Sequence, residues 1–362
     1  MRLIFFLSAL FGSFFLTGCR DALPTSKGPN LEIYTHLDLP SKGAYTGAYI
    51  DFGDSEDDVS LERLDEFEDL VGKHQAIIAS SSFWGEQTFP MKNLTIIAHY
   101  GAVPLVYWSP WDKPYEQNRK PDRFNLNAIV DGKWDTYIDA WANSAKEYKR
   151  PLFVAWGLEM NGTWFPWSGS FYGSNKPADS NKITKWAGPE LYKKAYRYVV
   201  DRVRKQGASN ILWVFHTNNY SYPNEDWNGM KAYYPGSEYV DFLGMSAYGK
   251  QFKNEDWVTA TDTFSYPYEE LAALDPDKPL MLAEWGIGEF EKSGNKAGWI
   301  RDALALLSTK YPRLKAIVFW NERWENSDGS ISNLRVTSSP EAFKAYREGI
   351  ANPFWIGTPL LR

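Results

Sequence analysis

The sequence predicts an α/β protein, a (β/α)₈ TIM barrel that forms a single domain behind an N-terminal signal segment. Eight short apolar runs alternate with amphipathic helix-like runs over about 310 residues, which matches such a barrel in count and size. The chain has 362 residues and is 44% hydrophobic, which is enough for one large core. No glycine-rich phosphate-binding turn follows the first run, which disfavours an open doubly wound sheet.

The predicted strands are short apolar runs that end in polar or turn-forming residues. They lie at 45–51, 75–80, 103–108, 152–158, 211–215, 240–246, 280–284 and 316–320. The predicted helices lie at 58–72, 90–100, 132–148, 189–206, 257–273, 296–310 and, after the last strand, 340–350. The second helix and the one after the sixth strand have the weakest patterns. In a barrel of this kind the functional site lies at the C-terminal ends of the strands.

The first residues resemble the signal of a bacterial lipoprotein. Met1 and Arg2 precede an apolar run, Leu3 to Leu16, that is too short for a good transmembrane helix. The motif LTGC that ends this run is similar to a lipobox, and its Cys19 is the only cysteine of the chain. We therefore expect residues 1–18 to be a signal peptide and Cys19 to be lipidated. An ordinary secretory signal with an incidental cysteine is the alternative.

The segment after Cys19 predicts attachment to a membrane through a tether. Residues 19–44 are rich in proline, serine, lysine and glycine, and the domain is expected at 45–352 with a C-terminal tail at 353–362. Arg20 rather than an aspartate follows the cysteine, which favours the outer membrane over the inner membrane of the cell envelope. A lipid-anchored monomer that faces the periplasm or the cell surface is expected.

Composition excludes some classes of function and favours another. The net charge is −6 with acids and bases interspersed, so the sequence offers no basic face for nucleic acid. No zinc or redox-metal signature is present, and we expect neither a metal nor a cofactor. Aromatic residues are abundant, with 17 Trp, 22 Tyr and 21 Phe. Many of the tryptophans lie in expected loops, which favours a sugar-binding cleft over the alternative of a large aromatic core.

Two glutamates at the ends of predicted buried strands are the strongest functional signal. Glu159 follows the run LFVAWGL, and Glu284 ends the run PLMLAE. A buried carboxylate is costly unless it has a partner or a role. Glycoside hydrolysis needs two carboxyl groups that face each other across a sugar. For either glutamate alone, a paired structural carboxylate is the alternative.

Three segments resemble glycoside hydrolase family 26, the β-mannanase family. They are EMNGTWFPW at 159–167, YPGSEYVDFLGMSAYG at 234–249 and KPLMLAEWG at 278–286, in the order of that family. The resemblance implies that Glu159 is the general acid/base and Glu284 the nucleophile of a retaining endo-β-glycanase. It also implies that Tyr248 hydrogen-bonds Glu284 and that Trp320 forms the floor of the sugar subsite next to the cleaved bond.

Further contacts to a polysaccharide substrate are expected around these residues. By the resemblance, Trp164 and Trp167 shape the adjoining subsites. Candidates at other strand ends are Trp108, Trp285, His216 and Asn218. A hydrogen-bonded core position is an equal alternative for His216, and a role in a turn is an equal alternative for Asn218.

Two positions depart from the mannanase pattern of the family. Leu158 stands where such enzymes have a histidine, and Ala155 stands where an arginine is frequent. By the resemblance β-1,4-mannan is the first expected substrate, but other substrates compete with it, because a site built for a particular hydroxyl discriminates strongly. They are mixed-linkage β-glucan, β-1,3-xylan and an exopolysaccharide. A non-catalytic glycan-binding lipoprotein is the alternative from another class.

Overall fold

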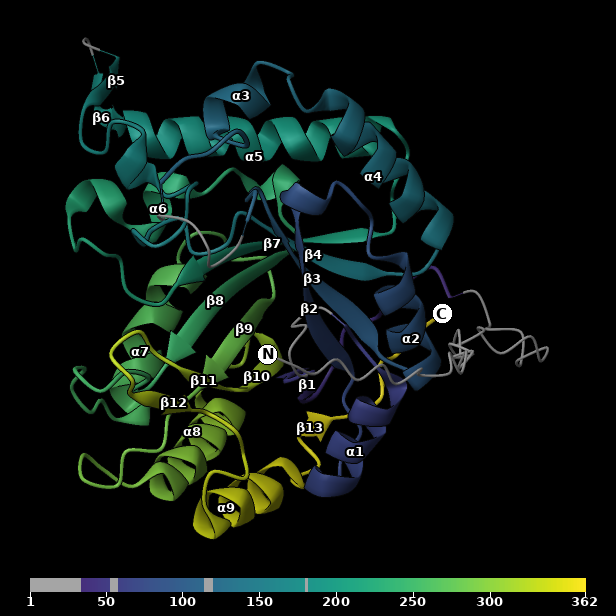
Figure 1. Cartoon of the computed structure of the whole chain (residues 1–362), viewed down its shortest axis with the longest axis vertical. Coiled ribbons are helices and arrows are strands. Elements are labelled where there is room, and N and C mark those ends of the chain that lie inside the picture. The colour runs from purple at the N-terminus through teal and green to yellow at the C-terminus, as the bar shows by residue number, and fades with distance from the viewer. Residues whose placement is uncertain (1–33, 53–57, 114–119, 180–181) are drawn as a thin grey trace, which may run out of the picture. The chain divides into compact units, whose positions relative to one another are not determined.

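The computed structural model describes residues 34–52, 58–113, 120–179 and 182–362 (Figure 1). Eight parallel strands follow one another around a barrel, and β10 pairs with β1 to close it. The predicted (β/α)₈ barrel is confirmed. Its strands are β1 (Ala44–Ile50), β2 (Ile77–Phe83), β3 (Val103–Ser109), β4 (Leu152–Trp156), β7 (Ile211–Asn218), β8 (Phe242–Tyr248), β9 (Leu280–Gly286) and β10 (Leu314–Asn321).

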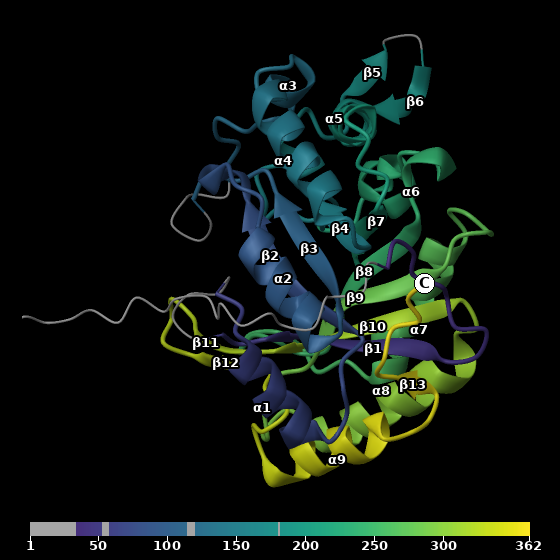
Figure 2. The same ribbon diagram turned by 90° about the vertical axis from the view of Figure 1, so that its right-hand side faces the viewer.

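Helices cover the outside of the barrel, as the two views in Figures 1 and 2 show. All seven predicted helices are present. Between β7 and β8, where no helix was predicted, the described residues contain only short helical turns and the four-residue α6 (Met230–Tyr233). The others are α1 (Leu61–Val71), α2 (Met91–Tyr100), α3 (Leu126–Val130), α4 (Asp135–Tyr148), α5 (Ala187–Lys205), α7 (Ala260–Ala272), α8 (Lys296–Lys310) and α9 (Pro340–Ile350).

Local sequence explains where several helices begin. The side chains of Ser60, Asn295 and Ser339 each accept a hydrogen bond from a backbone N–H of the first turn that follows. Such caps satisfy N–H groups that lack a partner within the helix. At Ser339 the cap is reinforced by Pro340 in the first turn, where its fixed φ suits a helix.

Two short hairpins were not predicted. The strands β5 (Pro177–Asp179) and β6 (Lys182–Trp186) form an antiparallel pair that projects near the start of α5 (Figure 1). The strands β11 (Arg323–Glu325) and β12 (Ile331–Asn333) form a second pair directly after β10. Their strands of three to five residues are too short and too polar to show an alternating apolar pattern.

The expected tail at 353–362 is part of the folded body. Its strand β13 (Trp355–Ile356) pairs with the start of β1, and Trp355 is buried. Leu361 forms a bridge with Leu37, which lies within the expected tether. The expected domain limits at 45 and 352 are therefore too narrow, because residues on both sides pair with each other and with β1.

The N-terminal segment with Cys19 lies outside the described residues. Among the helices of the described ranges, none is long and apolar enough to cross a bilayer.

Candidate active site

Glu159 lies on a turn rather than on a strand. β4 ends at Trp156, two residues before the predicted end, and the chain then turns with φ of 57° at Gly157 and 51° at Glu159. The left-handed region suits glycine but is uncommon for other residues. The backbone N–H of Glu159 donates to the carbonyl oxygen of His216 on β7, at 2.7 Å. This geometry directs the Glu159 carboxyl group to the C-terminal mouth of the barrel.

Side chains that follow Glu159 hold this turn in place. The amide of Asn161 donates to the carbonyl oxygen of Asn218 at 2.9 Å and accepts from the backbone N–H of Asn218 at 2.8 Å. The indole N–H of Trp167 donates to the carbonyl oxygen of Leu158 at 2.6 Å. Backbone strain at functional sites persists only where surrounding contacts determine it, and these three hydrogen bonds supply such contacts.

Glu284 lies near the C-terminal end of β9 and is held by its neighbours. The hydroxyl of Tyr248 on β8 donates to its Oε2 at 2.7 Å. Across the barrel, the hydroxyl of Tyr107 on β3 donates to the carbonyl oxygen of Ala283 at 2.8 Å. Ser246 on β8 is paired in register with Glu284. The predicted contact between Tyr248 and Glu284 is therefore present.

The carboxyl groups of Glu159 and Glu284 influence each other. Burial raises the pKa of Glu159, while hydrogen bonds from Ser246 and Trp164 act in the opposite direction. Burial raises the pKa of Glu284 well above its usual range, and the charge of Glu159 raises it further, against hydrogen bonds from Tyr248 and Ser246. Because a second negative charge is disfavoured beside the first, the pair retains a proton more readily than two isolated carboxyl groups.

Trp164 contacts one carboxyl group of the acidic pair directly, that of Glu159. Its indole N–H donates to Glu159 Oε2 at 2.5 Å, and its side chain is only partly buried. An N–H donor favours the ionised form of the carboxyl group that accepts from it. Trp164 is therefore placed to stabilise Glu159 after that residue has given up a proton.

An aromatic platform lies beside the two glutamates. Trp320, near the end of β10, stacks on Tyr49 of β1 with ring centroids 3.9 Å apart and an angle of 5° between the planes. Its indole N–H donates to Glu322 Oε2 at 2.8 Å. Tyr49 is buried, whereas Trp320 is partly exposed. A flat ring with one supported face and one accessible face suits the apolar side of a sugar ring.

Several expected substrate contacts have other positions. Trp108 is buried outside the strands, stacked on Trp141 of α4 at 3.9 Å. Trp285 is buried in the same way beside Trp299 of α8. Neither ring has an exposed surface, so the prediction that they bind a sugar is not supported by their positions. Both rings lie in the layer between barrel and helices.

Three further candidates also have structural contacts. Trp167 is buried and supports the turn at Leu158 through its indole N–H. His216 has no exposed surface, and its Nε2 lies 2.7 Å from Ser246 Oγ. The side-chain amide of Asn218 donates to the carbonyl oxygen of Tyr220, as in a turn. The surroundings of His216 therefore fit a hydrogen-bonded core position, and those of Asn218 fit a role in a turn, better than direct contact with a sugar.

Four residues around the glutamates were not among the predicted site residues. They are Ser246 and Tyr107, which contact Glu284 or its strand, and Tyr49 and Glu322, which support Trp320. The alternation of side-chain direction along a strand could have identified three of them. Ser246, Tyr107 and Tyr49 occupy strand positions whose side chains point into the barrel. Glu322 lies beyond the end of β10, where side chains no longer alternate in a regular way.

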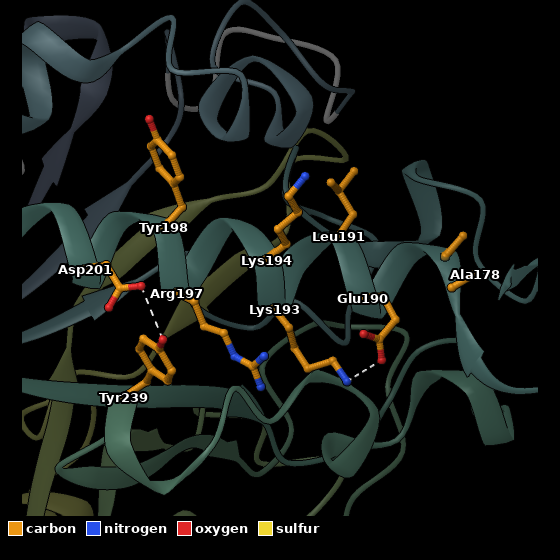
Figure 3. Close-up of a pocket in the computed structure, with 10 residues that line it drawn as sticks. Ala178, Glu190, Leu191, Lys193, Lys194, Arg197, Tyr198, Asp201 and Tyr239 are labelled. Carbon is orange, nitrogen blue, oxygen red and sulfur yellow. Dashed lines mark hydrogen bonds and ion pairs between the residues drawn. The ribbon is translucent and has the colours of Figure 1, made fainter. Parts of the chain in front are cut away.

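A hollow of about 660 Å³ lies elsewhere, on the outside of the barrel along α5 (Figure 3). Lys193 pairs there with Glu190 at 2.5 Å, and Tyr239 donates to Asp201 at 3.2 Å. Ala178 borders the hollow from the β5–β6 hairpin. Neither glutamate of the barrel mouth lines it, so this hollow is separate from the candidate active site.

Two neighbouring buried carboxyl groups and a supported tryptophan at the mouth of a (β/α)₈ barrel are an arrangement typical of glycoside hydrolases. The model of Glycosyl hydrolase family 26 matches residues 95–281, about half of the chain. The chain belongs to this family, and the predicted resemblance is confirmed.

Individual relatives differ in how much they share with this chain. Endoglucanase H of Acetivibrio thermocellus is 29% identical over 331 residues, which is 88% of this chain and 32% of that protein. A mannan endo-1,4-beta-mannosidase of Bacillus subtilis is 32% identical over 167 residues, 46% of this chain and 38% of that protein. The chain thus spans about a third of the length of these relatives. A solved Bacillus subtilis mannanase shares the fold, with a TM-score of 0.59, 18% identity and 88% of each chain covered.

Proposed function

We propose that this protein is a retaining endo-β-glycanase in which Glu159 is the general acid/base and Glu284 the nucleophile. The observation that carries the proposal is that two buried carboxyl groups lie close enough for the charge of Glu159 to raise the pKa of Glu284, and that each accepts a hydrogen bond from its own aromatic side chain. Tyr248 donates to Glu284 and Trp164 donates to Glu159. A retaining glycosidase needs one carboxyl group ionised and the other protonated before the reaction begins.

The reaction proceeds in two steps. Glu159 gives its proton to the glycosidic oxygen while Glu284 attacks the anomeric carbon, so the bond to the leaving sugar breaks and a glycosyl ester forms. Glu159 then takes a proton from water, and the resulting hydroxide displaces Glu284 from the anomeric carbon. Tyr248 stabilises the Glu284 carboxylate before the first step and after the second. Trp164 stabilises the Glu159 carboxylate between the two steps.

We propose a β-glucan as the principal substrate. Endoglucanase H aligns with 88% of this chain, whereas the mannosidase of Bacillus subtilis aligns with 46%. Leu158 and Ala155 are buried and apolar, so neither side chain can hydrogen-bond a sugar hydroxyl. β-1,4-Mannan is the second candidate, because the mannosidase has the higher identity over the segment that it shares.

A substrate panel tests this proposal. The chain without residues 1–19 should release new reducing ends from mixed-linkage β-glucan faster than from β-mannan, glucomannan or β-1,3-xylan, and the Glu284→Gln variant should release none. Fragments of intermediate length at early times would identify endo cleavage. Faster release from mannan would select the second candidate. Binding of a glycan by the wild type without any release would instead support a glycan-binding protein.

We also propose that the protein is held at the cell envelope by lipid on Cys19. A single acyl chain gives only marginal membrane binding, whereas several chains on one residue anchor stably. We expect the full-length protein to sediment with membranes and the Cys19→Ser variant to lose that association without losing hydrolytic activity. Wild-type and variant protein in the same fraction would contradict the anchor.

A further inference from the structure

The hydroxyl group of Ser246 lies at the centre of the acidic pair. It hydrogen-bonds the carboxyl group of Glu159 and that of Glu284. Its Oγ also lies 2.7 Å from Nε2 of His216. Ser246 has no exposed surface, so its hydroxyl finds its partners within the protein. A hydroxyl has one hydrogen to donate and two lone pairs to accept with.

His216 determines how that hydroxyl can be used. Burial lowers the pKa of His216 to about 3, so its ring is neutral and carries one N–H. Among the described residues, its Nδ1 has no hydrogen-bond partner. An N–H on Nδ1 would thus be a buried donor without an acceptor, which is costly. The N–H therefore lies on Nε2 and donates to Ser246 Oγ, which leaves the serine hydrogen for a carboxylate.

Each of the other polar groups around the pair acts on one carboxyl group only. Tyr248 is placed to donate to Glu284, and Trp164 to Glu159, so each favours the ionised form of its own carboxyl group. Tyr107 donates to a backbone carbonyl, and the charge of Glu322 raises the pKa of Glu284. Ser246 alone among these groups touches both carboxyl groups and can both donate and accept.

We propose that Ser246 is a positioning residue that keeps one proton on the glutamate pair and follows that proton through the reaction. With Glu159 protonated, Ser246 accepts from its O–H and donates to the Glu284 carboxylate. After the first step Glu284 is an ester and Glu159 is a carboxylate, so the Ser246 hydroxyl rotates and donates to Glu159. The second step reverses this rotation. His216 donates to the same oxygen throughout and keeps it in place.

This inference rests on the proposed double displacement, and a pair of variants tests it. In Ser246→Ala the hydroxyl is lost, so we expect kcat to fall on the order of 10- to 100-fold with little change in KM. The pH range over which kcat/KM is high should also become narrower, because the acidic and basic limbs of the pH profile move toward each other. Ser246→Thr keeps a hydroxyl and should recover most of both quantities. Thermal unfolding of each variant reports whether the fold is intact.

Contrary outcomes are distinct. A wild-type pH profile in Ser246→Ala would overturn the role of Ser246. Equal losses of kcat in Ser246→Ala and Ser246→Thr, with the acidic and basic limbs of the pH profile as far apart as in the wild type, would overturn it as well. His216→Leu should move the profile in the same direction as Ser246→Ala, whereas His216→Gln retains an N–H donor and should move it less. Glu284→Gln is measured in parallel. An active Glu284→Gln would overturn the proposed function itself, whereas an inactive one beside an unaltered Ser246→Ala would overturn this inference alone.

Discussion

The Glu284→Gln variant should lose hydrolysis by a factor on the order of 10⁴ or more, because an amide cannot form the glycosyl ester. Glutamine has nearly the shape of glutamate and can still accept from the Tyr248 hydroxyl. The loss should therefore be in kcat rather than in folding or substrate binding. Initial rates of reducing-end release, with binding of the same glycan measured by calorimetry, separate these effects. Wild-type turnover by the variant would eliminate Glu284 as the nucleophile.

Glu159→Gln provides the matched comparison. General acid catalysis contributes about 10²- to 10⁴-fold, so its loss should be severe on a polysaccharide, whose leaving group is a poor one. On an aryl β-glycoside with an acidic phenol as leaving group, the first step needs little protonation, so kcat/KM should fall much less, whereas kcat stays low because the second step still lacks its base. Glu284→Gln should be inactive on both substrates. Equal losses for the two variants on the aryl glycoside would contradict the assignment of roles.

The pKa shifts add a stability signature to these variants. A carboxyl group whose pKa is raised in the folded state favours the fold fully below its unfolded pKa and loses that contribution as pH rises through the folded pKa. Burial raises the pKa of Glu284 well above its usual range. We therefore expect Glu284→Gln to have a higher Tm than the wild type at neutral and alkaline pH, and an advantage that shrinks as the pH falls.

Trp285→Ala should destabilise the protein by about 3–5 kcal/mol, which is the usual cost of truncating a buried tryptophan. The ring is buried between β9 and the helices, beside Trp299 and Tyr346. Trp320→Ala is the matched control. Because Trp320 is partly exposed, its truncation should cost less stability and instead raise KM. Denaturant unfolding and steady-state kinetics of both variants check the pair.

The opposite pattern would contradict this assignment. Weak substrate binding by Trp285→Ala with unchanged stability would restore Trp285 as a sugar contact. A destabilised Trp320→Ala with normal KM would make the Trp320–Tyr49 stack a structural element only.

The alternation of side chains along a strand explains why Trp108 and Trp285 lie away from the barrel mouth, where they were expected. Neighbouring residues on a strand point to opposite faces. Once Glu284 points into the barrel mouth, Trp285 must point to the helices, and the same holds for Tyr107 and Trp108. The prediction chose aromatic residues by their closeness to a strand end and did not apply this rule. Strict alternation along β3 would have selected Tyr107, rather than Trp108, as the side chain that points into the barrel.

Other features depend on contacts that no local pattern reports. The two glutamates could be singled out because a carboxylate after an apolar run is visible in one sequence. The left-handed turn at Gly157 and Glu159 depends on partners at Trp167 and on β7, far along the chain. The surroundings of Ser246 on β8 arise because β7, β9 and the turn after β4 bring His216, Glu284 and Glu159 together, and a serine within a strand gives no such signal.

The first and last described residues of the chain meet at one end of the barrel. Thr35 donates from its backbone to Arg362, and β13 pairs with the first residues of β1. The polypeptide therefore joins the body at the N-terminal end of the strands, whereas Glu159 and Glu284 lie at the C-terminal end. Removal of residues 353–362 would therefore leave the backbone N–H groups of Thr35 and His36 without their acceptor at Arg362, at the end of the barrel opposite to both glutamates.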